Sequence, residues 1–349
     1  MALPEHQAEP DLAPVPEPSV RKRSGGGPAV RRRTRLARGP LTIGESAPRV
    51  EPRLAAAEPY RPDTIADGGE VFGLTIRSAS VRGLQKRYVG GPRQDDLCLG
   101  VHPPTETLIV AVADGVSAAT HSHLAAALAV RQAVAAVARQ LDEGAGELDW
   151  TEIFEQAAWA LVEEHRRGRY DADADAREAA PALATTLVVA ALTPEQDQNA
   201  DHPPEQCPDA IGPAKGQNGR GPEPRTLRLQ TAAVGDSPVL VLTQDTFEPV
   251  VGETDDADGL VGAGVRALPR HTRPTCAKPR SLRRGSVLLV CTDGLALPLA
   301  NGIGEVGRTL ARELADPPDI VDFARLLDFS RSTYDDDRTL VAVWPGSRS

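Results

Sequence analysis

Residues 290–299 read VCTDGLALPL and bring an ionisable side chain to the end of an apolar run. The run 286–292 has the length and apolar character of a buried strand, and Gly294 then leads into a helix-like stretch. Burying an isolated carboxylate costs several kcal/mol unless a positive or hydrogen-bonding group meets it. Asp293 therefore predicts a partner at this end of the strand.

Four other stretches place acidic residues at the edges of apolar runs. They are GPRQDDLCLGV (91–101), LIVAVADGVSAA (108–119), LQTAAVGDSPVLVL (229–242) and YDDDRTLVAVW (334–344). Any one Asp-Gly after a strand is more often a turn than a ligand. Five such positions in one chain are harder to explain by turn chemistry alone.

The bulk composition indicates a folded protein with a sizeable core. The chain has 349 residues, of which 40% are hydrophobic and 3% are aromatic. This length suits two average domains or one large α+β domain. The scarcity of aromatic residues argues against the base-stacking surfaces of RNA-binding proteins.

The first 65 residues differ from the rest in composition. They are rich in Pro, Gly and Arg, and residues 1–40 carry eight basic against four acidic side chains within a chain of net charge -10. We interpret residues 1–65 as a disordered basic tail that forms no part of the core or of a site, and residues 66–349 as the folded domain. A solvated tail is favoured over a nucleic-acid contact because the remainder is acidic, so a nucleic-acid partner is unlikely.

Several features favour a cytoplasmic protein. The four cysteines form no C-x-x-C motif, which is typical of reduced thiols. No apolar run approaches the roughly 18 residues expected of a membrane span. Residues 1–20 lack the apolar region of a secretory signal.

Strands and helices follow in groups, which favours layered α+β packing over an alternating parallel sheet. A Pro-, Gly-, Gln- and Asn-rich stretch, 194–224, is interpreted as a flexible insertion between two adjacent strands. Strands are expected at 71–81, 96–101, 107–113, 184–192, 226–234, 238–243, 286–292 and 339–344, and helices at 121–141, 150–168, 304–314 and 318–329.

This arrangement of strands would bring several carboxylates close together. An antiparallel hairpin over 96–113 would make Asp95 and Asp114 neighbours, and Asp236 is expected in a tight Gly-Asp-Ser hairpin turn. If the strand ends share one edge, the like charges there require raised pKa values or a cation. An all-oxygen donor set favours Mg²⁺ or Mn²⁺, and no His or Cys spacing indicates zinc.

The order of motifs Q-D-D, A-D-G, G-D-S, T-D-G and D-D-x-T resembles the metal-dependent protein phosphatases of the protein phosphatase 2C type, in a bacterial form, over about residues 70–345. The resemblance implies two stacked antiparallel β-sheets flanked by helices. It also implies a binuclear Mn²⁺ or Mg²⁺ site, at which water activated by the metal pair hydrolyses phosphoserine or phosphothreonine in proteins. The implied partners are phosphorylated proteins of signalling systems, targets of bacterial serine/threonine kinases.

The same resemblance implies roles for individual residues. Asp114 would bridge the two metals with help from the Gly115 carbonyl. Asp293 and Asp336 would hold one metal, and Asp95 would serve the other directly or through water. Asp236 matches a position that supports a weak third metal.

Departures from the family pattern keep a second hypothesis open. Gln94 stands where many members have Glu, and Gly90 stands where an Arg often binds the substrate phosphate. We assign phosphate binding to Arg93, with Arg87 as an alternative. The alternative function is a pseudophosphatase that binds or scaffolds phosphoproteins without turnover.

Overall fold

Two antiparallel β-sheets form the centre of the domain. The computed structural model describes residues 41–56, 58, 60–169, 173–195, 226–252, 265–299 and 302–346, which belong to one compact unit, Gly39–Ser349. One sheet has the strand order β1-β2-β12-β11-β7-β8 and the other the order β10-β6-β5-β4-β3, with β9 paired to β6. The strands are β1 (Thr64–Val71), β2 (Leu74–Val81), β3 (Asp96–His102), β4 (Thr107–Ala113), β5 (Leu187–Pro194), β6 (Leu227–Val234), β7 (Val239–Thr243), β8 (Thr246–Val251), β9 (Thr275–Cys276), β10 (Arg280–Leu282), β11 (Val287–Cys291) and β12 (Arg338–Pro345).

The inner faces of the two sheets pack on each other. One buried cluster joins Val110 and Val188 of one sheet to Leu288 and Val341 of the other. These strands are Val-, Leu- and Ala-rich because both of their faces are covered. The stacked antiparallel sheets confirm the predicted fold class.

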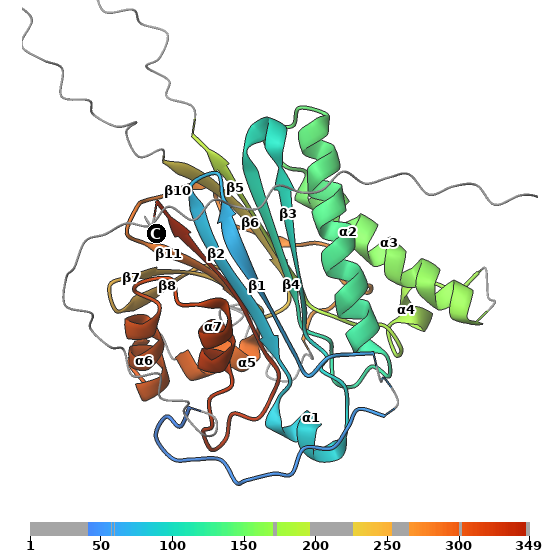
Figure 1. The fold of residues 1–349 in the computed structure, drawn as a ribbon. Helices are drawn as coiled ribbons and strands as arrows, with labels where there is room; N and C mark the ends of the chain where they lie inside the picture. The colour runs from blue at the N-terminus through green and yellow to red at the C-terminus, as the bar shows by residue number, and fades with distance from the viewer. Residues whose placement is uncertain are drawn as a thin grey trace, which may run out of the picture. The chain divides into compact units, whose positions relative to one another are not determined.

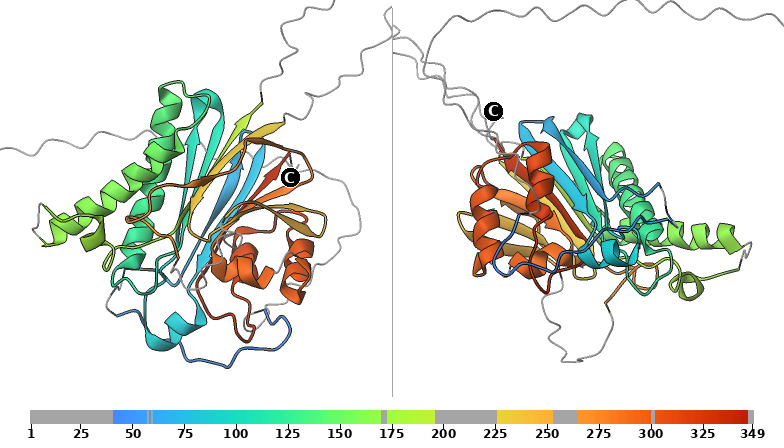
Figure 2. Two further views of the ribbon diagram at one scale, coloured as in Figure 1. Left: turned by 180° about the vertical axis from the view of Figure 1, so that it is seen from behind. Right: turned by 60° about the horizontal axis from the view of Figure 1, so that its bottom comes forward.

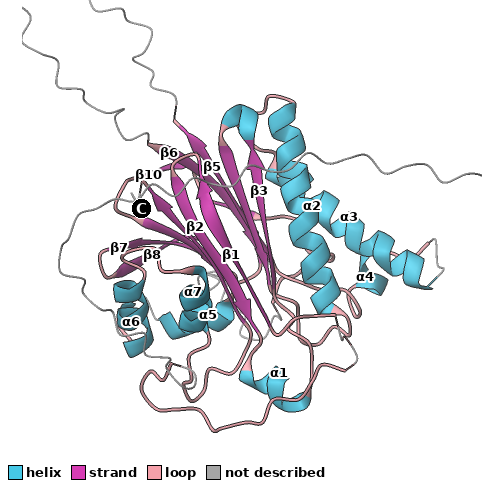
Figure 3. Ribbon diagram, viewed as in Figure 1, coloured by secondary structure: helices cyan, strands magenta, loops and turns pink. Residues whose placement is uncertain are grey.

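Helices cover the outer faces of the sandwich, as Figures 1, 2 and 3 show. α2 (Ser122–Asp142) and α3 (Trp150–Arg169) pack on the β3–β6 sheet through a cluster that includes Ala129 and Phe154. The short helix α4 (Ala176–Ala179) follows α3. α5 (Asp293–Leu299), α6 (Glu305–Glu313) and α7 (Ile320–Leu327) cover the other sheet.

Among the described helices, only α2 is long and apolar enough to cross a membrane. Its Ala-rich face is buried against the sheet and α3. Small side chains on this face allow the helix to lie close to β3, where a Cβ at Gly100 would collide with Val134. This is the packing of a core helix.

Strand pairing tests two expectations about connections. β5 and β6 are adjacent and antiparallel, with Leu187 opposite Val234, as predicted for strands on either side of the 194–224 insertion. Residues 196–225 of this stretch lie outside the described residues. The turn at Asp236, however, is not a hairpin: β6 and β7 belong to different sheets, and Gly235, with φ +99°, redirects the chain between them.

The predicted tail is shorter than expected from composition. Residues 1–40 lie outside the described residues, but β1 already begins at Thr64 and residues 41–63, here called the N-terminal strap, contact the domain. Ile43 is 5% exposed and belongs to the core cluster of Phe323 and Phe329. Part of the region predicted as tail therefore contributes to the core, because sparse apolar residues of the strap are buried despite its lack of periodicity.

Deletion of residues 1–60 should lower the free energy of unfolding by at least ~2 kcal/mol, the lower end of the loss for one large buried side chain. Deletion of residues 1–40 removes none of the contacts described and should leave it unchanged. Urea unfolding of the two truncated proteins and the full chain measures the difference. Equal midpoints and slopes for all three would show that the strap contributes nothing to stability.

Candidate metal centre

The β3–β4 hairpin brings two of the predicted ligands together. Asp96 pairs with Ala113 in the antiparallel register, so Asp95 lies beside Asp114. Burial raises the pKa of Asp114, and the carboxyls of Asp95 and Asp293 lie close enough for their charges to raise it further. Asp293, whose partner the sequence left open, therefore meets Asp114.

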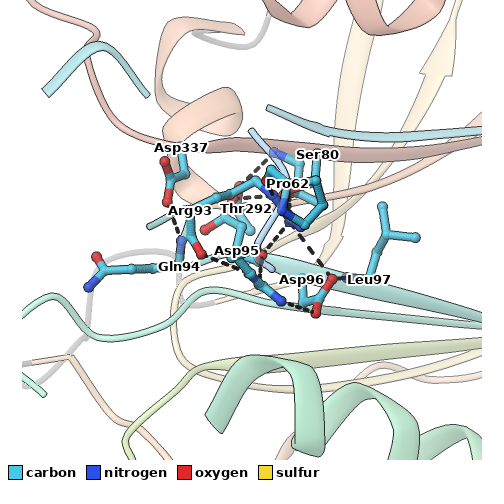
Figure 4. A network of polar contacts seen from close by, with 11 residues as sticks. Pro62, Ser80, Arg93, Gln94, Asp95, Asp96, Leu97, Thr292 and Asp337 are labelled. Atoms are coloured by element: carbon cyan, nitrogen blue, oxygen red, sulfur yellow. Dashed lines mark hydrogen bonds and ion pairs between the residues drawn. The ribbon is translucent and has the colours of Figure 1, made fainter. Parts of the chain in front are cut away.

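Asp95 is the most enclosed of these carboxylates. It is 1% exposed. Its Oδ2 accepts hydrogen bonds from Thr292 Oγ1 and Thr339 Oγ1, both at 2.8 Å. Thr292 directly precedes Asp293, and Thr339 lies at the start of β12, just after Asp336 and Asp337, so two further segments of the chain converge on the Asp95 carboxylate. Figure 4 shows Thr292 beside Asp95.

The backbone of Asp114 is fixed by two threonines of the opposite strand end. Its carbonyl accepts from Thr186 N–H at 2.8 Å and from Thr185 Oγ1 at 2.8 Å. Its N–H donates to Thr186 Oγ1 at 3.0 Å. These hydroxyls orient the loop and have no base beside them that would make them nucleophiles.

Gly115 and Gly294 permit the close approach of neighbouring loops. A Cβ at Gly115 would lie 2.7 Å from the carbonyl oxygen of Ser122, and one at Gly294 would collide with the carbonyl of Asp337. Glycine at these two positions is therefore required for close packing, in addition to the ligand role predicted for the neighbouring aspartates. A side chain at either glycine would push apart the loops that carry the carboxylates.

Asp337 is a site residue that the sequence analysis did not assign. It is 2% exposed, and its two oxygens accept from Gly83 N–H and Gln94 N–H, each at 2.6 Å. Asp336 beside it is half-exposed and accepts from Asp337 N–H at 2.8 Å. The run of three aspartates at 335–337 was the available signal, but it does not reveal which member points inward.

Burial and mutual repulsion hold protons on this cluster in the absence of a cation. Burial, then the charge of Asp337, raises the pKa of Asp95 to about 8. Burial also raises the pKa of Asp114, with further contributions from Asp95, Asp293 and Asp336. Burial likewise raises the pKa values of Asp293 and Asp337, the latter opposed by hydrogen bonds from the Gly83 and Gln94 amides.

The donor set fits a hard divalent cation. Buried, hydrogen-bonded carboxylates with raised pKa values are groups whose protons a metal would displace, and the oxygen ligands suit Mg²⁺ or Mn²⁺. Within the described residues, no three His, Cys, Asp or Glu side chains are already arranged around one point. We therefore expect the carboxylates to rearrange as an ion binds.

Arg93, the predicted phosphate-binding residue, is buried and engaged within the domain. Its guanidinium is 1% exposed and donates to Ser80 Oγ at 2.6 Å and to the Asp95 carbonyl at 2.5 Å. Burial, followed by the positive charge of Arg61, lowers its pKa. The alternative, Arg87, is engaged with Asp63 and Asp328, each at 2.7 Å.

A different cation lies at the rim of the cluster. Lys86, on α1 (Leu84–Val89), has its Nζ 4.0 Å from Asp336 Oδ1 and donates to Ser117 Oγ at 3.1 Å. Ser117 in turn donates to Gln94 Oε1 at 3.2 Å. Lys86 was not predicted as a site residue because the helix that carries it, α1, was not predicted either.

Asp236 lies in the turn between the sheets, next to Ser237. The Ser237 hydroxyl is 3.0 Å from Thr186 Oγ1, the group that accepts from Asp114 N–H. The turn is thus linked to the site through two hydroxyls. The role of Asp236 at a third metal stays a prediction.

Part of the chain is similar to a known protein family. Residues 82–198 match the family model described as protein phosphatase 2C. This stretch contains Asp95 and Asp114, and the match confirms the resemblance over these residues. No curated protein sequence matches the chain.

Several solved phosphatase structures are similar to this chain at low sequence identity. The serine/threonine phosphatase MsPP of Mycobacterium smegmatis is 18% identical, with 80% of this chain and 100% of that chain covered and a TM-score of 0.45. The catalytic domain of the serine/threonine phosphatase PstP, solved with two manganese ions, is 19% identical, with coverages of 78% and 97% and a TM-score of 0.44. A phosphatase of Toxoplasma gondii is 13% identical, with coverages of 82% and 97% and a TM-score of 0.49.

The raised pKa values predict an unusual pH dependence of stability without metal. Between the ordinary carboxyl pKa and about 8, the folded state binds more protons than the unfolded state, so stability falls as pH rises through this window. We expect the melting temperature in EDTA to be higher at about pH 5 than at about pH 8.

Asp95→Asn should flatten this slope, since Asn cannot ionise, and the matched change of an exposed carboxylate, Asp67→Asn, should preserve it. Thermal unfolding followed by circular dichroism measures both. A wild-type melting temperature that rises with pH would contradict the buried-carboxylate description.

Proposed function

We propose that the protein is a metal-dependent protein-serine/threonine phosphatase that uses two Mn²⁺ or Mg²⁺ ions. The observation that carries the proposal is the cluster of Asp95, Asp114, Asp293 and Asp336 at one edge of the sandwich, where burial and the other three carboxylates raise the pKa of Asp114. The match of residues 82–198 to a protein phosphatase family supports it. The substrates would be phosphoproteins of bacterial kinase signalling in the cytoplasm.

The ligand roles are part of the proposal. Asp114 would contact both ions, with the Gly115 carbonyl beside it, Asp293 and Asp336 would hold one ion, and Asp95 would serve the other. When bound, the two ions would lower the pKa of water and neutralise phosphoryl charge. The chain's own residues fix the ligands: Thr292 and Thr339 orient Asp95, and Thr185 and Thr186 orient the Asp114 backbone.

In this proposal Lys86, rather than the buried Arg93, binds the substrate phosphate. Its ammonium lies beside the half-exposed Asp336, its side chain is 10% exposed, and its hydroxyl partner Ser117 is exposed. A phosphoryl oxygen that enters there would replace Ser117 Oγ as the acceptor of a hydrogen bond from Lys86, and this new bond would be charge-assisted. Gln94, held by the same hydroxyl, would line the entry without adding negative charge.

The pseudophosphatase alternative has no specific support in the described residues. Gln94 and Gly90 were the reasons to consider it. Gly90 ends α1 with φ +78°, a conformation that favours glycine, and the cation that the position lacks is offered by Lys86 from one turn earlier. Turnover assays separate the two functions directly.

Asp293→Asn should reduce turnover of a phosphothreonine peptide by at least about 10-fold at limiting Mn²⁺, since even outer-shell changes at metal sites cause ~10–100-fold losses. The buried fold should persist because Asn is isosteric. Steady-state assays in Mn²⁺, Mg²⁺ and EDTA measure the effect. Full activity of the wild type in EDTA would exclude a metal-dependent hydrolase, and wild-type turnover by the variant would remove Asp293 from the ligand set.

Lys86→Met should lower kcat/KM for p-nitrophenyl phosphate by about 10–100-fold at saturating Mn²⁺, the loss expected for one hydrogen bond to a charged group. Met keeps the length of the side chain but loses its charge. Arg87→Met on the same helix is the control, because Arg87 pairs with Asp63 and Asp328 instead. Similar kcat/KM values for the two variants would show that Lys86 does not contact the phosphoryl group.

A further inference from the structure

The N-terminal strap contacts two of the segments that carry candidate ligands, those of Asp336 and Asp95. Its first part lies against the loop before Asp336. Ser330 N–H donates to the Leu41 carbonyl at 2.7 Å, and Ser332 N–H donates to the Glu45 carbonyl at 2.8 Å. In Figure 1 this segment, drawn in blue, continues past α1 toward the start of β1.

Its second part holds the loop of Asp95 through a single side chain. Arg61 donates from Nε to the Arg93 carbonyl at 3.0 Å, from Nη1 to Asp96 Oδ2 at 2.8 Å, and from Nη2 to the Asp95 carbonyl at 2.7 Å. All three nitrogens of the guanidinium therefore donate hydrogen bonds to the four-residue stretch 93–96. The side chain is 14% exposed, so water competes little for these donors.

Arg93 completes the arrangement from within the loop. It donates to the same Asp95 carbonyl and to Ser80 Oγ, while its Nε lies 3.5 Å from the Pro62 carbonyl of the strap. Figure 4 shows this network around Asp95 and Asp96. One carbonyl oxygen therefore accepts charge-assisted hydrogen bonds from two guanidinium groups.

We propose that Arg61 is a positioning residue for the Asp95 loop, which makes the strap a working part of the metal site. The inference rests on the proposed function, since it takes Asp95 to be a ligand. The carboxylate of Asp95 is oriented by Thr292 and Thr339, but its backbone is oriented from the strap. Loss of the guanidinium fork would leave the carboxylate attached to a loop that can shift.

The charge of Arg61 and its positioning role predict opposite effects of its removal on cation binding, so the two can be told apart by experiment. Arg61 is positive, so its removal from the surroundings of the carboxylates would by charge alone strengthen cation binding. If Arg61 acts by position, its removal weakens cation binding instead. Lys at this place keeps the charge but cannot supply the three-point fork.

The experiment titrates Mn²⁺ into the metal-free full-length protein and reads free Mn²⁺ by electron paramagnetic resonance. Arg61→Ala should raise the dissociation constant about 10-fold or more, as outer-shell changes do, and Arg61→Lys should restore it only in part. Arg53→Ala is the matched control, because Arg53 is an exposed strap residue whose side chain rests on Tyr88. Melting in EDTA and kcat and KM for p-nitrophenyl phosphate at saturating Mn²⁺ are measured alongside, and kcat should recover there.

Mn²⁺ affinities of both Arg61 variants equal to the wild type, or a tighter affinity in Arg61→Ala, would overturn the positioning role. If Arg61→Ala does not fold, the same comparison with Arg61→Lys decides, because that variant should still bind more weakly than Arg53→Ala. Wild-type protein that binds Mn²⁺ but hydrolyses nothing would refute the proposed activity while the strap inference stands. Wild-type protein that binds no Mn²⁺ would overturn both.

Discussion

The accumulation of carboxylates at one edge of the sandwich is the constraint on which the rest of the site depends. Burial, together with the charges of neighbouring carboxylates, raises the pKa values of Asp95, Asp114, Asp293 and Asp337. Such a cluster would destabilise the fold if all its members were ionised without a cation. The surrounding hydroxyls, backbone amides and guanidinium groups compensate in part, and a divalent ion would replace the protons.

The scaffold explains why these side chains meet although they lie far apart in sequence. Asp114 ends β4 and Asp95 precedes β3, while Asp293 follows β11 and Asp336 precedes β12. The β3–β4 hairpin and the β11–β12 pair belong to different sheets, whose inner faces share one core. Stacking therefore brings the two pairs of strand ends to the same edge.

The fold and much of the candidate site were predictable from sequence for particular reasons. Apolar runs such as 107–113 and 286–292 correspond to β4 and β11 because strands buried on both faces are continuously hydrophobic. The burial of Arg93 was not predicted because a charged residue next to a motif is ordinarily solvated, whereas here it is enclosed by Ser80 and the Asp95 backbone. Lys86, Asp337 and Arg61 carried no local pattern, since their importance comes from contacts across more than 20 residues of sequence.

The central claim is that the carboxylate cluster binds two divalent ions. Anomalous diffraction from Mn²⁺-soaked crystals, collected on either side of the manganese absorption edge, tests it most directly. The account predicts two manganese peaks at the cluster, with Asp114 contacting both and Asp293 and Asp336 sharing one. Soaked crystals with no manganese peak within coordination distance of Asp114 would contradict it.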